Sequence, residues 1–224
     1  MEVTDVAVQK RRGRYNIFID GVFRLGLSES ILALYNLYVR KDIDEGLIKE
    51  IHEQEFLYRL YDRCVRKLGN RPHSERELRT YCRQVLWKES LKEATKGSRS
   101  SRNTSREMSE LNSDILIEKT MARLSDEKLV SDTEFASWWV EQRMRGGAKG
   151  WRMIAAELMK KGVDRKIIDE CVVTEGQELR SARGLVKKLR QRKSLDEEKI
   201  KRRLVSRGFP WDVIKQVMKI SDDE

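Results

Sequence analysis

The stretch that decides the fold is Ile154-Ala155-Ala156-Glu157-Leu158-Met159-Lys160-Lys161-Gly162-Val163. Its pattern returns 46 residues later as Ile200-Lys201-Arg202-Arg203-Leu204-Val205-Ser206-Arg207-Gly208-Phe209. Ile154, Leu158 and Val163 fall on Ile200, Leu204 and Phe209, and Gly162 falls on Gly208. A fixed period of this size is typical of stacked supersecondary units, not of a single catalytic domain. The sequence therefore predicts a repeat array, an architecture that presents an extended surface to a large partner.

Each copy of the repeat contains three apolar stripes of helical period. In the last copy, Gly208 is suited to end the second helix, and Pro210 fits the first turn of the third. In the middle copy, Gly162 ends the second helix and Asp164 caps the third. Both copies are therefore predicted to be three-helix units.

A first, more divergent copy precedes these two. Ser74, with Glu77 three residues later, predicts a capping box at the start of a helix. The next apolar residue, Leu78, corresponds to Ile154 of the middle copy. The distance between the two along the chain is longer than one 46-residue period, so the first copy contains extra residues. The polar, Ser/Arg-rich segment 88–113 accounts for the excess. Its scarcity of apolar residues predicts a mobile insertion with helices extending into its ends.

In the N-terminal residues, apolar and polar side chains alternate with the two-residue period of a β-strand. Residues 3–27 alternate as strands, and Asp20-Gly21 is a strong hairpin signal. Ser28 is the expected N-cap of a covering helix, because three short strands need such a partner in water. Either Asp42 or Asp44 is expected to cap the helix that follows.

These patterns predict a mainly α fold, in which tandem three-helix repeats form an elongated, curved array behind a small three-stranded antiparallel segment. The predicted domains are 1–54 (hairpin plus helices), 55–130 (repeat 1, with the insertion), 131–175 (repeat 2) and 176–224 (repeat 3).

The net charge of +10 is unevenly distributed. Residues 176–215 contain 13 Lys or Arg against five Asp or Glu, so the last repeat carries most of the excess. A basic balance of this kind attracts nucleic acid or an acidic protein groove, although a solvated helix face would also explain it.

The cysteines and the hydropathy indicate the compartment. Cys64, Cys82 and Cys171 show no CxxC spacing and fall on apolar helix positions, so we expect buried free thiols in a reducing environment. The first residues have no apolar signal region, and no stretch approaches the length of a membrane span. We expect a cytoplasmic protein with no membrane contact.

No converging set of catalytic groups is recognisable. His52 lies on a charged helix, and His73 precedes a helix start, where turn geometry explains it better than catalysis does. The glycine-rich run 145–150 lacks the Lys-Ser/Thr ending of a phosphate loop, and no Cys/His cluster has metal spacing. We therefore expect no enzymatic activity, no metal and no cofactor.

The charged helices favour a binding function. Tryptophans near them are expected in the core, with Trp138 the most exposed. Stacking would align the cations of the two regular repeats into a stripe suited to phosphates or an acidic groove. The candidate partner-binding residues are Arg143, Arg145, Lys149, Arg152, Lys160, Lys161, Lys187, Lys188, Arg190, Arg192, Lys193, Lys201, Arg202, Arg203 and Arg207.

Three runs together resemble the RecX family of bacterial recombination regulators. They are Arg71-Pro72-His73-Ser74-Glu75-Arg76-Glu77-Leu78-Arg79, the stretch 154–163, and Lys201-Arg202-Arg203-Leu204-Val205-Ser206-Arg207-Gly208-Phe209. The resemblance covers roughly residues 55–220, and the N-terminal segment resembles an extension carried by some members; the insertion at 88–113 departs from the pattern. It implies a three-helix array that binds the RecA filament groove and limits filament assembly, ATPase and strand exchange without chemistry of its own.

Three functions remain open from the sequence. The first is a monomeric RecA-filament regulator with weak contact to single- or double-stranded DNA. The second is an autonomous helix–turn–helix nucleic-acid binder, although the exposed faces of the third helices carry mixed charges and few Asn or Gln. The third is a structural adaptor with a partner unrelated to recombination.

Overall fold

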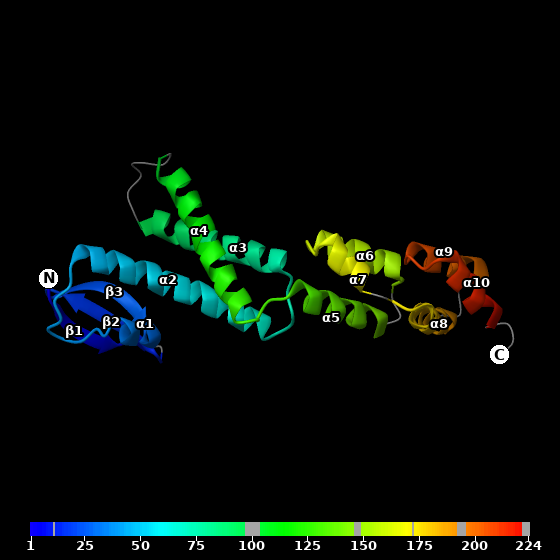
Figure 1. Cartoon of the computed structure of the whole chain (residues 1–224), viewed down its shortest axis with the longest axis horizontal. Coiled ribbons are helices and arrows are strands. Elements are labelled where there is room, and N and C mark those ends of the chain that lie inside the picture. The colour runs from blue at the N-terminus through cyan, green and yellow to red at the C-terminus, as the bar shows by residue number, and fades with distance from the viewer. Residues whose placement is uncertain (11, 97–103, 146–148, 172, 192–195, 221–224) are drawn as a thin grey trace. The chain divides into compact units, whose positions relative to one another are not determined.

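The computed structural model describes the chain except residues 11, 97–103, 146–148, 172, 192–195 and 221–224. The described residues form three strands and ten helices (Figure 1). They divide into two compact units. The first comprises Met1–Lys67 and Cys82–Leu124, and the second comprises Leu68–Tyr81 and Ser125–Glu224.

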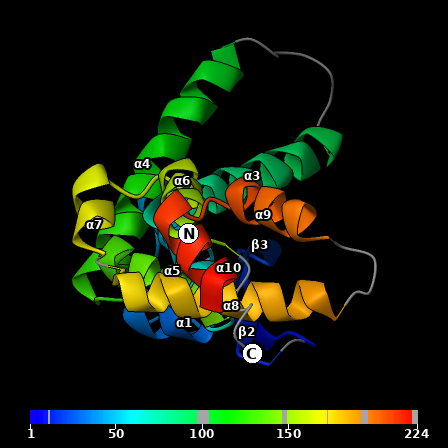
Figure 2. The same cartoon turned by 90° about the vertical axis from the view of Figure 1, so that its right-hand side faces the viewer.

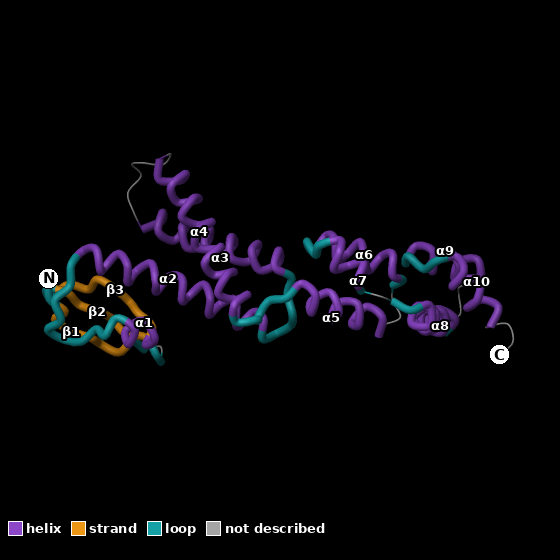
Figure 3. The backbone as a smooth tube through the Cα atoms, in the orientation of Figure 1, coloured by secondary structure: helices purple, strands orange, loops and turns teal. Residues whose placement is uncertain are grey.

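The first unit begins with an antiparallel sheet in the order β1 (Val3–Val8), β2 (Arg14–Ile19), β3 (Val22–Ser28). Among the described residues, strands occur only in this N-terminal part (Figure 3). Asp20 and Gly21, between β2 and β3, both have positive φ. A tight hairpin turn requires this conformation. The three-stranded segment and its hairpin turn are thus confirmed.

One face of the sheet packs on α1 (Glu29–Leu34) and on the start of α2 (Glu45–Leu68) through a continuous apolar cluster. Ser28 stands at the N-cap position of α1, but its hydroxyl donates to the buried Glu55 carboxylate at 2.8 Å. Ser28 is thus the N-cap residue, as predicted, but its side chain makes no capping hydrogen bond and ties the sheet to α2 instead. Arg14 supplies Glu55 with a charge partner at 3.0 Å.

The cap of α2 is Asp44, the second of the two predicted candidates. Its carboxylate accepts the Leu47 N–H at 2.7 Å. The helix then continues without a break through residue 55, where we placed the boundary of the first repeat. Its N-terminal half packs on the sheet, and its C-terminal half lies in the predicted first repeat. A single helix therefore belongs to both predicted domains.

Two long helices, α3 (Glu75–Lys96) and α4 (Thr104–Asp126), extend into both ends of the predicted insertion. The rest of that segment, 97–103, lies outside the described residues. Cys64 of α2 and Cys82 of α3 are buried free thiols with their sulfur atoms 3.4 Å apart, as expected. Cys171 is only half-buried because it lies at the C-cap of a short helix, so its predicted burial was wrong.

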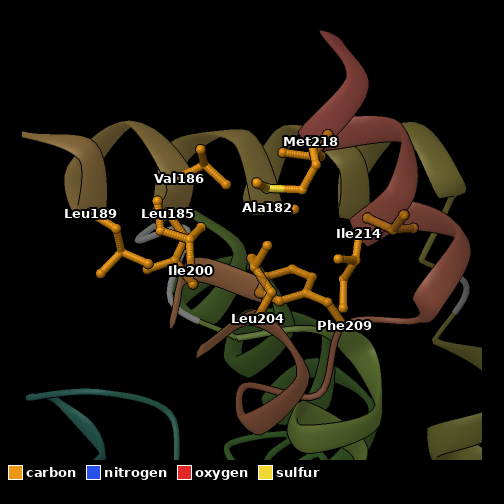
Figure 4. Close-up of a cluster of buried hydrophobic side chains, with 11 residues drawn as sticks. Ala182, Leu185, Val186, Leu189, Ile200, Leu204, Phe209, Ile214 and Met218 are labelled. Carbon is orange, nitrogen blue, oxygen red and sulfur yellow. The ribbon is translucent and has the colours of Figure 1, made fainter. Parts of the chain in front are cut away.

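The second unit contains two regular three-helix repeats. Each has its own apolar cluster, and Figure 4 shows that of the last repeat, where side chains from all three helices meet. Figure 2 shows these last helices packed around one another. The helices are α5 (Asp132–Arg145), α6 (Trp151–Lys160) and α7 (Arg165–Glu170), then α8 (Glu175–Arg190), α9 (Glu197–Ser206) and α10 (Trp211–Ile220).

The turns between second and third helices follow the sequence prediction. Gly162 and Gly208 both have positive φ. This is the left-handed conformation that a C′ glycine supplies without strain. The Asp164 side chain accepts the Lys166 N–H at 2.8 Å, as predicted, whereas Pro210 immediately precedes α10 instead of lying in its first turn. The mainly α fold with three-helix repeats is therefore confirmed, whereas the elongation and curvature of the array stay predictions.

Candidate partner-binding surface

Successive repeats are joined by a junction that occurs twice with equivalent residues. In the first junction, the Ser74 hydroxyl donates to the Lys161 carbonyl at 2.7 Å. In the second, the Gly150 N–H donates to the Arg207 carbonyl at 2.8 Å. Lys161 and Arg207 are one full period apart. The end of each second helix is thus fastened to the start of the second helix before it.

A carboxylate from the following first helix completes each junction. Asp132 accepts the N–H of Glu75, the first residue of α3, at 2.9 Å. Glu178 accepts the N–H of Trp151, the first residue of α6, at 2.8 Å. Both carboxylates satisfy an N–H that the helix itself leaves unpaired. Asp132 and Glu178 are again one period apart, so the junction follows the repeat residue by residue.

Burial at the junction raises the pKa of both carboxyls. For Asp132 the loss of solvation outweighs the opposing hydrogen bond from Glu75, and for Glu178 it outweighs that from Trp151. The structure therefore places two acids where their ionised forms are less favoured than in water.

Glycines allow the close approach of the second helices. A Cβ on Gly150 would lie 2.4 Å from the Gly208 carbonyl oxygen. A Cβ on Gly162 would lie 2.4 Å from Arg76, and one on Gly208 would lie 2.9 Å from Met153. Gly150 is therefore needed for packing, although its own φ of –82° suits any residue.

Three of the predicted binding cations are paired with carboxylates of the chain, two of them with Glu157 of the same repeat. This residue accepts the Trp139 indole N–H at 3.1 Å and the Arg143 Nε–H at 3.0 Å. The same carboxylate pairs with the Lys149 ammonium. Arg143 and Lys149 are thus neutralised within their own repeat and only partly exposed.

The third, Lys161, is engaged by another carboxylate, Glu77, which also accepts two hydrogen bonds from Arg71 at 3.1 and 3.3 Å. Burial alone would raise the pKa of Glu77, but its bonds to the two cations lower the pKa to about 2. The Lys161 and Arg143 cations also lie over the Trp139 ring, at 4.2 and 4.1 Å from a ring centroid. These charges stabilise the repeat from within.

Only part of the predicted capping box forms at α3. The Ser74 hydroxyl accepts the Glu77 N–H at 3.2 Å, as predicted. The Glu77 side chain instead forms ion pairs with Arg71 and Lys161. Ser74 thereby caps its own helix and binds the next repeat with one hydroxyl.

The remaining cations of the middle repeat are exposed. Arg145 pairs with Glu141 on its own helix, whereas no carboxylate of the described chain pairs with Arg152 or Lys160. These three side chains, from the end of α5 and from α6, face solvent.

In the last repeat, Lys187, Lys188 and Arg190 occupy the final turn of α8. The helix dipole favours positive charge at this end. Arg190 lies 3.8 Å from Glu197, and Arg202 lies 3.6 Å from Glu198. Arg192 and Lys193 lie outside the described residues. The α9 cations Lys201, Arg202 and Arg203 and its C-cap Arg207 complete the predicted set.

The tryptophan prediction was wrong in one respect. Trp138 is half-buried, because its ring contacts Phe135 and Trp139 and lies 5.9 Å from the Arg71 guanidinium. Trp211, the first residue of α10, is the more exposed at 53%.

The third helices present mixed charges, as the sequence indicated. Arg165 and Asp169 pair on the exposed side of α7, and Gln216 of α10 donates to Glu175 at 2.8 Å. Such a surface is unlike one that reads bases directly. Among the described residues, no three His, Cys, Asp or Glu side chains gather as metal ligands, and none of the described helices combines the length and apolar character needed to cross a bilayer.

Profiles of two known domains match parts of the chain. "Regulatory protein RecX N-terminal domain" matches residues 1–44, and "RecX, second three-helix domain" matches residues 131–172. A crystal structure of regulatory protein RecX superposes with a TM-score of 0.66 at 22% identity, covering 97% of this chain and 98% of that one. That of RecX from Lactobacillus salivarius gives 0.54 at 21% identity, covering 75% and 97%. Both structures are thus similar to this chain in fold.

Relatives that match nearly the whole of this chain are similar in sequence as well. The regulatory protein RecX of Listeria welshimeri is 27% identical over 96% of this chain and 74% of its own length. That of Oceanobacillus iheyensis is 30% identical over the same shares of the two chains. With two matching domains, a matching fold and this identity over nearly the whole chain, the protein belongs to the RecX family of regulatory proteins.

Proposed function

We propose that this protein regulates the RecA recombinase by binding the RecA–DNA filament and limiting its assembly, ATPase activity and strand exchange. It acts as a monomer in the cytoplasm, through contact alone and without catalysis. The observation that carries the proposal is the twice-used junction, because it stacks the repeats, each of which exposes cations, at a regular interval. Such spacing suits a partner that is itself repetitive and acidic.

Within the predicted set, the exposed cations are the proposed contacts. Arg152 and Lys160 of α6 and Lys187 of α8 are exposed and have no ion-pair partner among the described residues. Arg143 and Lys149 pair with Glu157 inside the middle repeat, and Lys161 pairs with Glu77 of the preceding repeat. Charge reversal at the exposed positions should therefore weaken binding without unfolding the repeat.

The experiment compares affinity for a RecA filament on single-stranded DNA with affinity for the same DNA alone, at several salt concentrations. A protein that relies on six or more phosphate contacts loses affinity on the order of a thousandfold between roughly 50 and 200 mM salt. We expect weak, salt-sensitive binding to bare DNA and much tighter binding to the filament. Equal affinities would favour an autonomous nucleic-acid binder and contradict the proposal.

A further inference from the structure

The second helices of the two regular repeats each expose one large apolar side chain at the same repeat position. Met159 of α6 is 44% exposed and Val205 of α9 is 53% exposed. Their chain neighbours Leu158 and Leu204 are fully buried and fill the two cores. A single exposed apolar residue needs no explanation, but one that recurs after a whole period is a feature of the repeat.

These two side chains lie outside the apolar cores of their repeats. The apolar cluster of the middle repeat includes Ile154 and Leu158 from α6, and that of the last repeat includes Ile200 and Leu204 from α9. Met159 and Val205 belong to neither cluster. Their exposed area is consequently available to another molecule.

Positive charge lies beside both apolar side chains. On α6, exposed Lys160 is adjacent to Met159, and exposed Arg152 is two turns before it. On α9, exposed Arg202 precedes Val205 by three residues. This spacing places the two on one side of the helix. Around Met159, Arg152 and Lys160 have no carboxylate partner in the described chain, whereas Arg202 pairs with Glu198 at 3.6 Å. The surface around Met159 is thus complementary to carboxylates.

The junction sets these two helices in series. The Gly150 N–H at the start of α6 bonds the Arg207 carbonyl at the end of α9, so the helices follow one another, as Figure 1 shows. The two apolar positions therefore recur on successive second helices, separated by one repeat. We call the surface formed by Arg152, Met159, Lys160, Arg202 and Val205 the second-helix face.

We propose that the second-helix face takes part in docking on a protein polymer, with Met159 and Val205 each entering an apolar recess on successive subunits and carboxylates edging the recess for Met159. The apolar side chains favour protein over bare nucleic acid, since phosphates offer them nothing to contact. Their recurrence favours a partner made of repeated subunits. The inference rests on the proposed function and names the surface that performs it.

The test measures affinity for a RecA filament on a single-stranded oligonucleotide, and for the oligonucleotide alone, with Met159→Ser, Val205→Ser and the double variant. The double variant should bind the filament roughly tenfold more weakly, and each single variant should fall between it and the unchanged protein. Affinity for the oligonucleotide should not change, because no cation is removed.

Leu129→Ser is the matched control, because Leu129 is 42% exposed in the same unit but outside the second-helix face. It should bind the filament as the unchanged protein does, and circular dichroism should show equal helical content for all variants. Full filament binding by the double variant would overturn the inference while leaving the proposed function intact. A parallel loss of binding to filament and oligonucleotide would overturn it in favour of a nucleic-acid surface. No preference of the unchanged protein for filament over DNA would overturn both proposals.

Discussion

Gly150 donates its backbone N–H to the carbonyl of Arg207 at 2.8 Å, and this bond fastens the start of α6 to the end of α9. The equivalent bond in the preceding junction comes from a serine hydroxyl, that of Ser74, to Lys161. A backbone donor and a side-chain donor therefore perform the same role in successive junctions. The stacking of the repeats depends on how closely these helix ends approach.

Gly150→Ala should destabilise the second unit, because the added methyl would collide with the backbone of Gly208. The expected loss is about 1–3 kcal/mol, as for other overpacked sites. Tryptophan fluorescence during urea unfolding measures the effect, since four of the five tryptophans lie in this unit. Gly176→Ala is the control: its Cβ would meet only the tip of Arg180, at 3.8 Å, so the variant should be about as stable as the original. Equal stabilities for both variants would contradict the proposed role of Gly150.

Residue Glu178 should tolerate loss of its charge, but not loss of the side-chain oxygen that accepts the Trp151 N–H. Burial raises its pKa, so ionisation is less favoured in the folded protein. This group's contribution to stability therefore falls as the pH rises through the folded pKa. Glu178→Gln, which keeps an acceptor for the Trp151 N–H, should be at least as stable at pH 7.

Glu178→Ala removes that acceptor and should cost about 1–2 kcal/mol. Urea unfolding of the two variants at pH 7 separates charge from hydrogen bonding. A glutamine variant as unstable as the alanine variant would show that the charge is required.

Glu77 should have the opposite effect on the pH dependence of stability: its contribution to the second unit should be lost as the pH falls. Its folded pKa is lowered to about 2 from the ordinary value of 4.5. Its stabilising contribution is therefore present above the ordinary value and is lost as the pH falls toward the folded one. Glu77→Gln should lower stability at pH 7 by about 2 kcal/mol and flatten the dependence between these pH values.

Glu141→Gln is the control for Glu77, since it removes the same charge from an exposed pair with Arg145. It should change stability by less than about 1 kcal/mol and leave the acid dependence in place. An equally steep acid dependence in Glu77→Gln would assign the transition to other groups.

The three thiols should differ in reactivity. Cys171 is half-buried, whereas Cys64 and Cys82 are fully buried, and the contact with Cys82, together with burial, raises the pKa of Cys64. Iodoacetamide should therefore modify Cys171 first in the native protein, and the other two only after unfolding. Mass spectrometry of labelled peptides checks the order, and simultaneous labelling of all three would contradict the packing of α2 against α3.

The helices were predictable because their apolar periodicity is local. Gly162 and Gly208 mark helix ends through a positive φ. The residue type itself favours this conformation. The pairing of Asp132 with Glu75 depends on tertiary structure, and their wide separation in the chain hides it. The offset between Asp132 and Glu178 was visible in the sequence, however, and would have indicated the junction.

The binding site was less predictable, because charge alone does not show which cations are paired. Lys149 and Lys160 are both basic residues beside the same helix. Folding brings Lys149 to Glu157, while Lys160 remains exposed. Ser28 illustrates the same limit: it is the N-cap residue of α1, but its hydroxyl donates to Glu55, a partner that the local sequence did not indicate.

The most direct measurement of the central claim is the DNA-dependent ATPase rate of the cognate RecA at increasing concentrations of this protein. We expect the rate to fall in a saturable manner, and reversal of Lys187, Lys188, Arg190 and Arg192 to Glu to abolish the inhibition while helical content is preserved. An ATPase rate that stays unchanged at a saturating concentration of the protein would contradict the proposed regulation of RecA.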